Sequence, residues 1–222
     1  RFRCWARNEI DHFVAAGLAE AGLQPSPAAD PATLARRAFL VLTGLPPTPQ
    51  ELDAFLADKN ADAYERLVDR LLTEEPYLTR HAEHLAQPWL DAGRYADTSG
   101  IHMDAGRQIW PWRDWLLQAI KQDLPFDQFV RDQIAGDLLP NATTAQRVAT
   151  GFLRNHVTTD EGGAIDEEYR VEYAVERTNT LGSVFLGLTL GCARCHDHKY
   201  DPITQKDYYQ LYSFFNQNQE PG

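Results

Sequence analysis

The stretch that decides the fold class covers residues 167–198 and reads EEYRVEYAVERTNTLGSVFLGLTLGCARCHDH. Its first part, residues 167–188, has the length and apolar content of a long helix. That helix leads directly to Cys192 and Cys195, which lie three positions apart, and to a histidine immediately after the second cysteine. We therefore expect a helical frame that presents two thiols and an imidazole together.

Residues 192–196, Cys-Ala-Arg-Cys-His, form the pattern C-x-x-C-H, which is the attachment signature for c-type haem. Two thiols at this spacing can each form a thioether with one vinyl group of a porphyrin. A neutral imidazole nitrogen of the following histidine then binds the iron. The pattern predicts one covalent haem c, attached through Cys192 and Cys195, with His196 as the proximal iron ligand.

Two other interpretations of the same residues stay open. Cys192 and Cys195, with His196 or His198, are also the residue types of a zinc site, although such sites usually show a second ligand pair. A C-x-x-C pair can also be a redox dithiol, typically near a βαβ pattern, and no strong strand pattern precedes these cysteines. The residues favour haem first, zinc second and the dithiol third.

An iron held by His196 has a sixth coordination position, which electron carriers fill with Met or His and catalytic haems leave open or water-bound. We predict three candidates for it. Met103, the one methionine of the chain, and His102 lie in an aperiodic stretch at residues 97–106, and His156 lies in a second one at residues 155–166. Each is expected in a loop, where it can approach the haem or its pocket.

Two further residues are predicted to contact the cofactor. His198 stands two residues after His196 and cannot easily reach the opposite face of the same iron, so we expect it to form a hydrogen bond within the haem pocket. Arg113 is a candidate partner for a haem propionate, together with Lys199, Arg94 and Arg170. Charge-assisted bonds to carboxylates are the stronger kind.

Composition sets broad limits on the chain. Its 222 residues suffice for one large domain or two small ones. The net charge of −11 argues against nucleic acid or an anionic membrane as a partner, and no apolar run approaches membrane-spanning length. Cys4 is left over, so we expect a partly buried thiol there and no disulfide framework. The chain opens with Arg rather than Met and shows no signal peptide, which predicts a segment of something longer.

Helical periodicity runs through almost the whole sequence and predicts an all-α fold with long irregular loops. Asp30 before Pro31 is a helix start, and Thr48 with Glu51 forms a capping box. Pro88 is expected to kink the helix that contains it. The expected helices cover residues 8–23, 31–42, 49 onward, 62–72, 77–95, 110–122, 125–138, 145–153, 167–188 and 204–215.

The acidic stretch at residues 160–168, DEGGAIDEE, has oxygen ligands that calcium prefers. It lacks the spacing of an EF-hand. We therefore favour a solvated turn followed by a helix whose first turn is acidic, with calcium as the alternative.

Successive short motifs make the whole chain resemble one family. They are IDHFV at 10–14, LTGLPPTP at 42–49, RYADT at 94–98, WRDW at 112–115, PFDQF at 125–129, AGDLLP at 135–140, EGG at 161–163 and GCARCHDHKYDP at 191–202. This pattern is similar to the planctomycete cytochrome c-type domain, a domain of unassigned biochemistry found in large secreted proteins of planctomycetes and related bacteria. Only residues 1–6 fall outside the resemblance.

The resemblance implies a single domain over residues 1–222, cut from a larger bacterial protein that is exported to the periplasm or the cell exterior. It also implies one haem c at Cys192, Cys195 and His196, near the C-terminal helices. We expect a monohaem electron carrier whose partner is a redox protein or an adjacent cytochrome domain. The rivals are a haem enzyme with an open sixth position, peroxidase-like or acting on a carbohydrate-derived substrate, and a zinc-stabilised or metal-free interaction module without haem.

Overall fold

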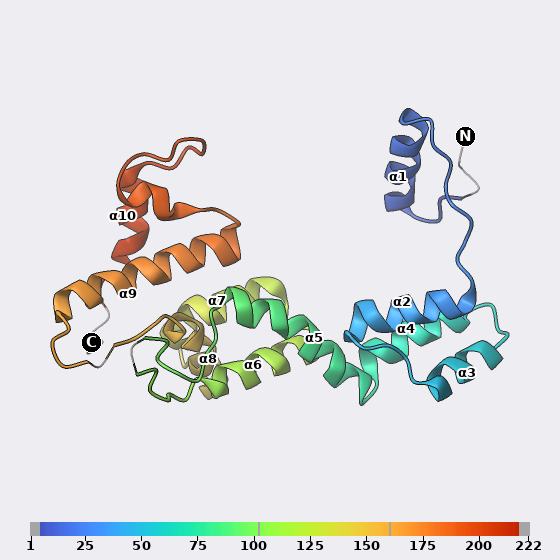
Figure 1. Cartoon of the computed structure of the whole chain (residues 1–222), viewed down its shortest axis with the longest axis horizontal. Helices are drawn as coiled ribbons and strands as arrows, with labels where there is room; N and C mark the ends of the chain where they lie inside the picture. The colour runs from blue at the N-terminus through green and yellow to red at the C-terminus, as the bar shows by residue number, and fades with distance from the viewer. Residues whose placement is uncertain (1–4, 102, 160, 218–222) are drawn as a thin grey trace. The chain divides into compact units, whose positions relative to one another are not determined.

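Helices form all the regular secondary structure in the part of the chain that the structure, a computed structural model, describes, namely residues 5–101, 103–159 and 161–217 (Figure 1). One isolated bridge joins Thr98 to Gly106. The prediction of an all-α fold is therefore confirmed.

The chain divides into two compact units. The first contains residues 1–41 and 45–69, and the second contains residues 42–44 and 70–222. The first unit holds α1 (Glu9–Glu20), α3 (Pro49–Ala57) and most of α2 (Pro31–Thr43) and α4 (Ala63–Thr73). The predicted haem motif lies in the second unit, whose structure is followed below.

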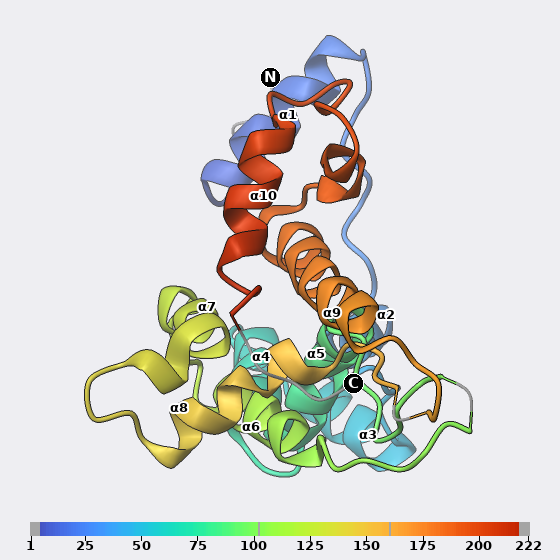
Figure 2. The same cartoon turned by 90° about the vertical axis from the view of Figure 1, so that its left-hand side faces the viewer.

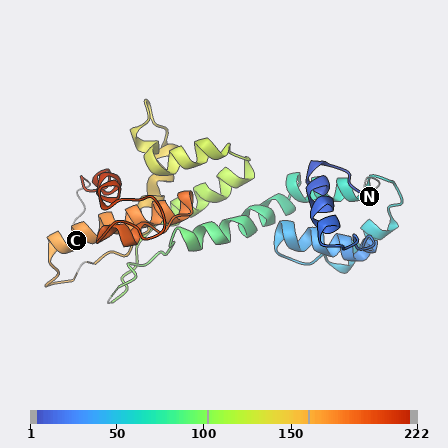
Figure 3. The same ribbon diagram turned by 90° about the horizontal axis from the view of Figure 1, so that it is seen from above.

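The second unit contains six longer helices and four short turns within the described residues (Figures 1, 2 and 3). The helices are α5 (Tyr77–Ala92), α6 (Trp110–Lys121), α7 (Phe126–Ala135), α8 (Thr144–Ala149), α9 (Asp166–Leu181) and α10 (Gln205–Ser213). The turns are η1 (Gly136–Leu138), η2 (Thr150–Arg154), η3 (Gly182–Leu186) and η4 (Leu190–Arg194). Figures 1 and 2 place α10 and α6 on opposite sides of α9.

Helix starts follow the capping residues that the sequence displays. Asp30 Oδ1 accepts a hydrogen bond from Thr33 N at 3.0 Å, as predicted for the start of α2. Thr48 Oγ1 accepts from Glu51 N at 3.2 Å, while the Glu51 carboxylate accepts from Thr48 N at 2.6 Å. This is the predicted capping box of α3. These exchanges satisfy backbone N–H groups that the first turn leaves without a helical partner.

Several predicted helices are shorter in the structure. The one expected at residues 167–188 ends as α9 at Leu181 and continues as the π-turn η3. Gly182 stands at this change, and Leu190 packs on it so closely that an added Cβ would lie 2.5 Å from Leu190 Cγ. Gly187 then takes a φ of 64°, which suits glycine and turns the chain back.

The other differences lie at helix ends. The helices expected at residues 125–138 and 145–153 each finish in a 3-10 turn, η1 and η2 respectively. The helices expected at residues 8–23 and 77–95 end at Glu20 and Ala92. Pro88 stands inside α5, as the sequence indicates.

Two hydrophobic clusters build the second unit. One surrounds Trp112 on α6 and includes Ala86, Leu116, Ala119, Phe129 and Phe152. The other joins α9, η4 and α10 through Ala174, Val175, Leu181, Leu190, Ala193, Tyr208, Tyr212 and Phe215. Leu153 and Phe185 pack against both clusters. The second cluster matters most here, because it fixes η4, which carries Cys192, against two helices.

Asp97 connects the loop after α5 to the start of α6. Its Oδ1 accepts from the backbone N–H groups of Ile109 and Trp110, both at 2.9 Å, and its Oδ2 accepts from the hydroxyl of Tyr95. The Tyr95 bond, followed by the two backbone bonds, lowers the pKa of the Asp97 carboxyl. Burial, followed by the same hydrogen bond, raises the pKa of the Tyr95 hydroxyl to about 12.

A carboxyl whose pKa is lowered by folding stabilises the folded state above its unfolded pKa of about 3.9, and this contribution is lost as the pH falls through the folded pKa. We therefore expect Asp97→Asn to flatten the acid limb of the stability curve. Chemical denaturation between about pH 5 and about pH 2 measures this. Asp91→Asn, at an exposed carboxylate outside the Asp97 contacts, is the matched control. Equal pH slopes for Asp97→Asn and the parent would contradict the expectation.

Candidate functional site

The turn η4 arranges the cysteines and the histidine of the predicted haem motif. The backbone N–H groups of Cys195 and His196 both face the carbonyl oxygen of Cys192, at 3.3 and 3.4 Å. Cys192 and Cys195 are free thiols, and both are exposed. A reagent or cofactor can therefore reach both sulfurs without any change in the described fold.

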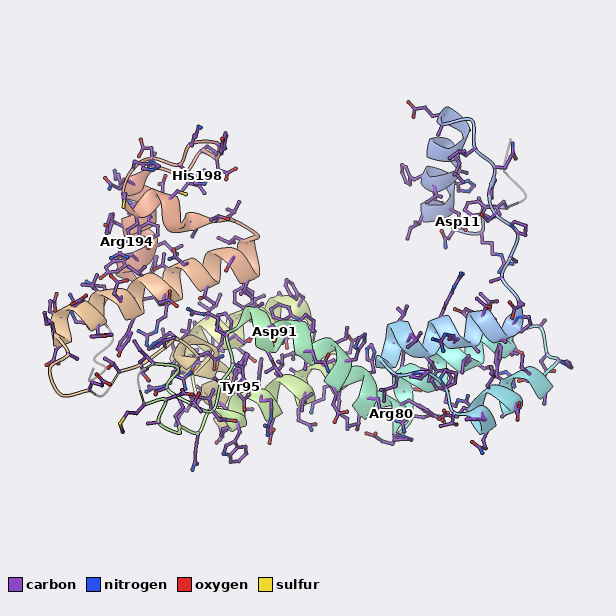
Figure 4. All side chains as sticks on the ribbon, viewed as in Figure 1. Asp11, Arg80, Asp91, Tyr95, Arg194 and His198 are labelled. Carbon is purple, nitrogen blue, oxygen red and sulfur yellow. The ribbon has the colours of Figure 1, made fainter. Side chains whose placement is uncertain are left out.

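Arg194, which lies between the two cysteines, anchors this turn to both neighbouring helices (Figure 4). Its guanidinium donates to both carboxylate oxygens of Glu172 on α9, at 3.1 and 2.5 Å, and this bond raises the pKa of Arg194. Its carbonyl accepts from Gln205 Nε2 and from the hydroxyl of Tyr209 on α10, each at 3.1 Å. Because the pairing uses two hydrogen bonds, it fixes the orientation of the Arg194 guanidinium as well as its position on α9.

The imidazole of His196 is exposed and is oriented by its own neighbour. His196 Nδ1 lies 2.8 Å from the carbonyl oxygen of Asp197. A carbonyl only accepts, so Nδ1 carries the proton in the neutral ring and Nε2 keeps its lone pair. Asp197 is held in turn, because its Oδ1 accepts from Gln205 N, at the start of α10, at 2.7 Å. His196 therefore offers a metal-binding nitrogen on an oriented ring.

His198 has a different arrangement, with only 9% of its side chain exposed. Its Nδ1 accepts from the backbone N–H groups of Asp201 and Tyr200, at 2.9 and 3.3 Å, and lies 3.3 Å from the Asp201 carboxylate. With Nδ1 as acceptor, the neutral ring carries its proton on Nε2. The ring therefore serves the loop at residues 195–204, and a part for it in cofactor binding stays a prediction.

The candidates for the sixth iron position lie elsewhere in the second unit. His156 is 1% exposed, with Nδ1 at 2.9 Å from the carbonyl oxygen of Val157 and Nε2 at 2.7 Å from Arg177 Nη2. Ligation through Nε2 would require Arg177 to give up this bond. Met103 is 90% exposed, and His102 lies outside the described residues.

The two aperiodic stretches that carry these candidates are joined to each other, which the sequence did not indicate. Thr158 N donates to Ser99 O at 3.0 Å. Arg107 donates to the carbonyl oxygens of Asn155 and His156, at 3.0 and 2.7 Å. Burial, followed by the charges of Arg107 and Arg177, lowers the pKa of Arg94 to about 10. Arg107 thus joins the two stretches, and Arg177 on α9 holds the second one through His156.

Arg113, the candidate propionate partner, is on α6. This helix and α10 lie on opposite sides of α9 (Figures 1 and 2). Its guanidinium donates to Asp114 Oδ1, at 3.1 and 3.0 Å, and to the hydroxyl of Tyr95 at 3.4 Å. Figure 4 likewise shows Tyr95 on the other side of α9 from Arg194 and His198. The structure therefore does not bring Arg113 together with the C-x-x-C-H motif.

The acidic stretch predicted as a turn or calcium loop supplies the first turn of α9, which contains Asp166, Glu167 and Glu168. Glu167 pairs with Arg170, with Oε1 at 2.5 Å from Nη2. Asp160 lies outside the described residues. In the described ranges, no three or more His, Cys, Asp or Glu side chains are gathered so that they could hold a metal ion, and calcium binding stays a prediction. Cys4 also lies outside the described residues.

Four residues that position the motif were missed at the level of sequence: Glu172, Arg194, Asp197 and Gln205. Arg194 and Asp197 had a visible signal, because they stand inside or directly beside the motif. Glu172 lies 22 positions before its partner Arg194. Nothing in the local pattern links the two.

Comparison with known proteins gives one match. The model of the family PSCyt2, described as a protein of unknown function (DUF1549), matches residues 9–220. No curated protein and no solved structure matches the chain. Among the helices of the described ranges, none combines the length and the apolar character needed to span a membrane. The family match runs through both compact units, and the chain belongs to the PSCyt2 family.

Proposed function

We propose that this chain is a c-type cytochrome domain that binds one haem covalently and transfers electrons outside the cytoplasm. The observation that carries the proposal is the state of residues 192–196. Both thiols are exposed, and the His196 ring holds its Nδ1 on the Asp197 carbonyl, leaving Nε2 as the basic nitrogen. These residues fit a haem c attached at Cys192 and Cys195. Haem bound there would supply a one-electron couple at the protein surface.

The chain's own residues have separate tasks in this proposal. Cys192 and Cys195 hold the group covalently, and His196 Nε2 binds its iron. Asp197 orients the His196 ring and is itself fixed to α10 through Gln205. Arg194 fixes the turn through Glu172 on α9. The electron partner we propose is a redox protein or a neighbouring cytochrome domain, and export rests on the family resemblance.

A haem enzyme with an open sixth position is the second candidate. The observation that favours it is the position of the predicted sixth ligands. Both ring nitrogens of His156 already have partners, and Met103 is exposed to solvent. An iron with no sixth protein ligand binds water or substrate there.

Visible spectra of the chain produced with the haem c maturation machinery distinguish these functions. We expect a sharp Soret band. Split absorption bands after reduction would indicate a low-spin, six-coordinate iron and therefore an electron carrier. A high-spin spectrum that shifts with cyanide or peroxide indicates the enzyme. Absence of a Soret band together with one bound zinc per chain would refute both haem functions.

The two histidines of the motif provide a matched pair of variants. His196→Ala removes the proximal ligand, so we expect the low-spin spectrum to be lost while the thioethers remain. His198→Ala affects only loop contacts, so we expect the spectrum of the parent. A spectrum unchanged by His196→Ala but altered by His198→Ala would show that His198, and not His196, is the iron ligand. Absorption and magnetic circular dichroism measure both variants.

A further inference from the structure

A groove in the second unit lies on the side of α6 that faces α8 and the end of α7. Its cavity has a volume of about 680 Å³. The lining side chains include two tryptophans, Trp110 and Trp115, both on α6. The haem motif is on the other side of α9 (Figures 1 and 2). The groove is therefore separate from residues 192–198, and none of those residues lines it.

The backbone of Trp110 and the ring of Trp115 are each held by a neighbouring residue. Trp110 is 46% exposed, and its backbone N–H donates to Asp97 Oδ1 at 2.9 Å, which fixes the start of α6. The ring of Trp115 stacks on that of Phe129, with centroids 5.6 Å apart and an interplanar angle of 21°. One face of Trp115 is thus packed, while the ring still lines the groove. Rigid aromatic surface costs little conformational entropy when a ligand binds.

The polar lining is arranged along two walls. Asp114, Gln118 and Gln122 are spaced by four residues and form one row on α6. The side-chain amides of Gln118 and Gln122 both line the groove. The facing wall contains Asp132 and Gln146, whose Oδ1 and Nε2 lie 3.4 Å apart. Planar carboxylates and amides can each bond two neighbouring hydroxyl groups at once.

The charges of the lining exclude one class of ligand. Asp114 and Asp132 are acidic, and no Lys, Arg or His of the described residues lines the groove. An anionic ligand would lie beside two carboxylates without a cation to pair with it. Arg113, next to the groove, is already paired with Asp114. The lining therefore disfavours anionic ligands, and its amides and carboxylates can bond hydroxyl groups.

We propose that this groove binds a neutral oligosaccharide. The apolar C–H face of a sugar ring packs on an exposed indole, and its hydroxyl groups bond the amide and carboxylate rows. The row from Trp110 to Gln122 is about 18 Å long at 1.5 Å per residue, which accommodates several sugar units. The walls are helical and present no strand edge, so the groove lacks the main-chain groups that hold an extended peptide.

Titration calorimetry of the full chain with cellohexaose and mannohexaose tests this proposal, with hexagalacturonate as the anionic counterpart. We expect at least one neutral hexasaccharide to bind saturably and more tightly than hexagalacturonate. Trp110→Ala and Gln118→Ala should each weaken that binding, by about tenfold for the tryptophan. Trp5→Ala, at a tryptophan of similar exposure (39%) outside the groove, should leave binding unchanged.

Three results would overturn the assignment. They are the absence of binding by both neutral hexasaccharides at millimolar concentration, tighter binding of hexagalacturonate, and equal affinity of the parent and both groove variants. Gln118 is exposed on a helix, and alanine favours helices. Gln118→Ala therefore keeps the test informative if Trp110→Ala alters folding. None of these measurements depends on bound haem, so the groove and the cytochrome proposal can fail independently.

Discussion

The double variant Cys192→Ala with Cys195→Ala is expected to carry no covalent haem, and the parent chain is expected to carry one per molecule. Each thioether needs one of these sulfurs, and both thiols are exposed and free, Cys192 on η4 and Cys195 directly after it. Denaturation in acidified solvent separates attached from merely bound haem. Mass spectrometry of the denatured chain then gives the result as the presence or absence of the mass of one haem.

Cys4→Ala is the matched control, because Cys4 is the remaining thiol of the chain and lies outside the motif. It should retain the full haem mass. Each single variant, Cys192→Ala or Cys195→Ala, should retain at most one thioether and release its haem more readily. Haem that stays on the double variant after denaturation would show that attachment uses other residues, and the cytochrome proposal would then fail.

Trp112→Ala is expected to lower the free energy of unfolding of the second unit by about 3–5 kcal/mol. Trp112 is 1% exposed and forms the centre of the cluster between α5, α6 and η2. Its ring contacts those of Tyr95 and Phe152, at centroid distances of 6.1 and 6.0 Å. Gly151 packs so closely that an added Cβ would lie 2.8 Å from Trp112 Cβ. Chemical denaturation followed by far-ultraviolet circular dichroism measures the loss.

Trp112→Phe separates the packing of the ring from its polar group. The Nε1 atom of Trp112 is buried and has no hydrogen-bond partner among the described residues. Phenylalanine therefore loses volume but no hydrogen bond, and we expect less than half of the destabilisation caused by alanine. A phenylalanine variant as unstable as the alanine variant would indicate that Nε1 forms a bond important for the fold.

The sequence predicted the helices well because their starts are encoded within four residues. Asp30 with Thr33, and Thr48 with Glu51, are local exchanges between a side chain and a nearby backbone group. The end of α9 could not be predicted in this way. It depends on Leu190 packing against Gly182 after the chain has turned back, which is a tertiary contact without a local signal.

The candidate site shows the same division. The positions of Cys192, Cys195 and His196 follow from a contiguous motif, and the structure presents them together on one turn. Propionate partners and a sixth ligand depend on residues far apart in the chain, and side-chain type alone does not place them. Arg113 illustrates this, because its guanidinium bonds Tyr95 and Asp114. Tyr95 packs against the hydrophobic cluster around Trp112 and not against the cluster that holds η4.

The loop at residues 195–204 is tied down by bonds that lie entirely within the protein. His198 N donates to Ile203 O at 2.8 Å, and Gln205 N donates to Asp197 Oδ1 at 2.7 Å. Fixing the backbone of one residue costs about 1–2 kcal/mol in conformational entropy, and these bonds offset part of that cost. Asp197 is held at two points, because its carboxylate accepts from Gln205 N and its carbonyl oxygen lies 2.8 Å from His196 Nδ1. A substitution at residue 197 should therefore disturb the start of α10 and the orientation of the His196 ring together.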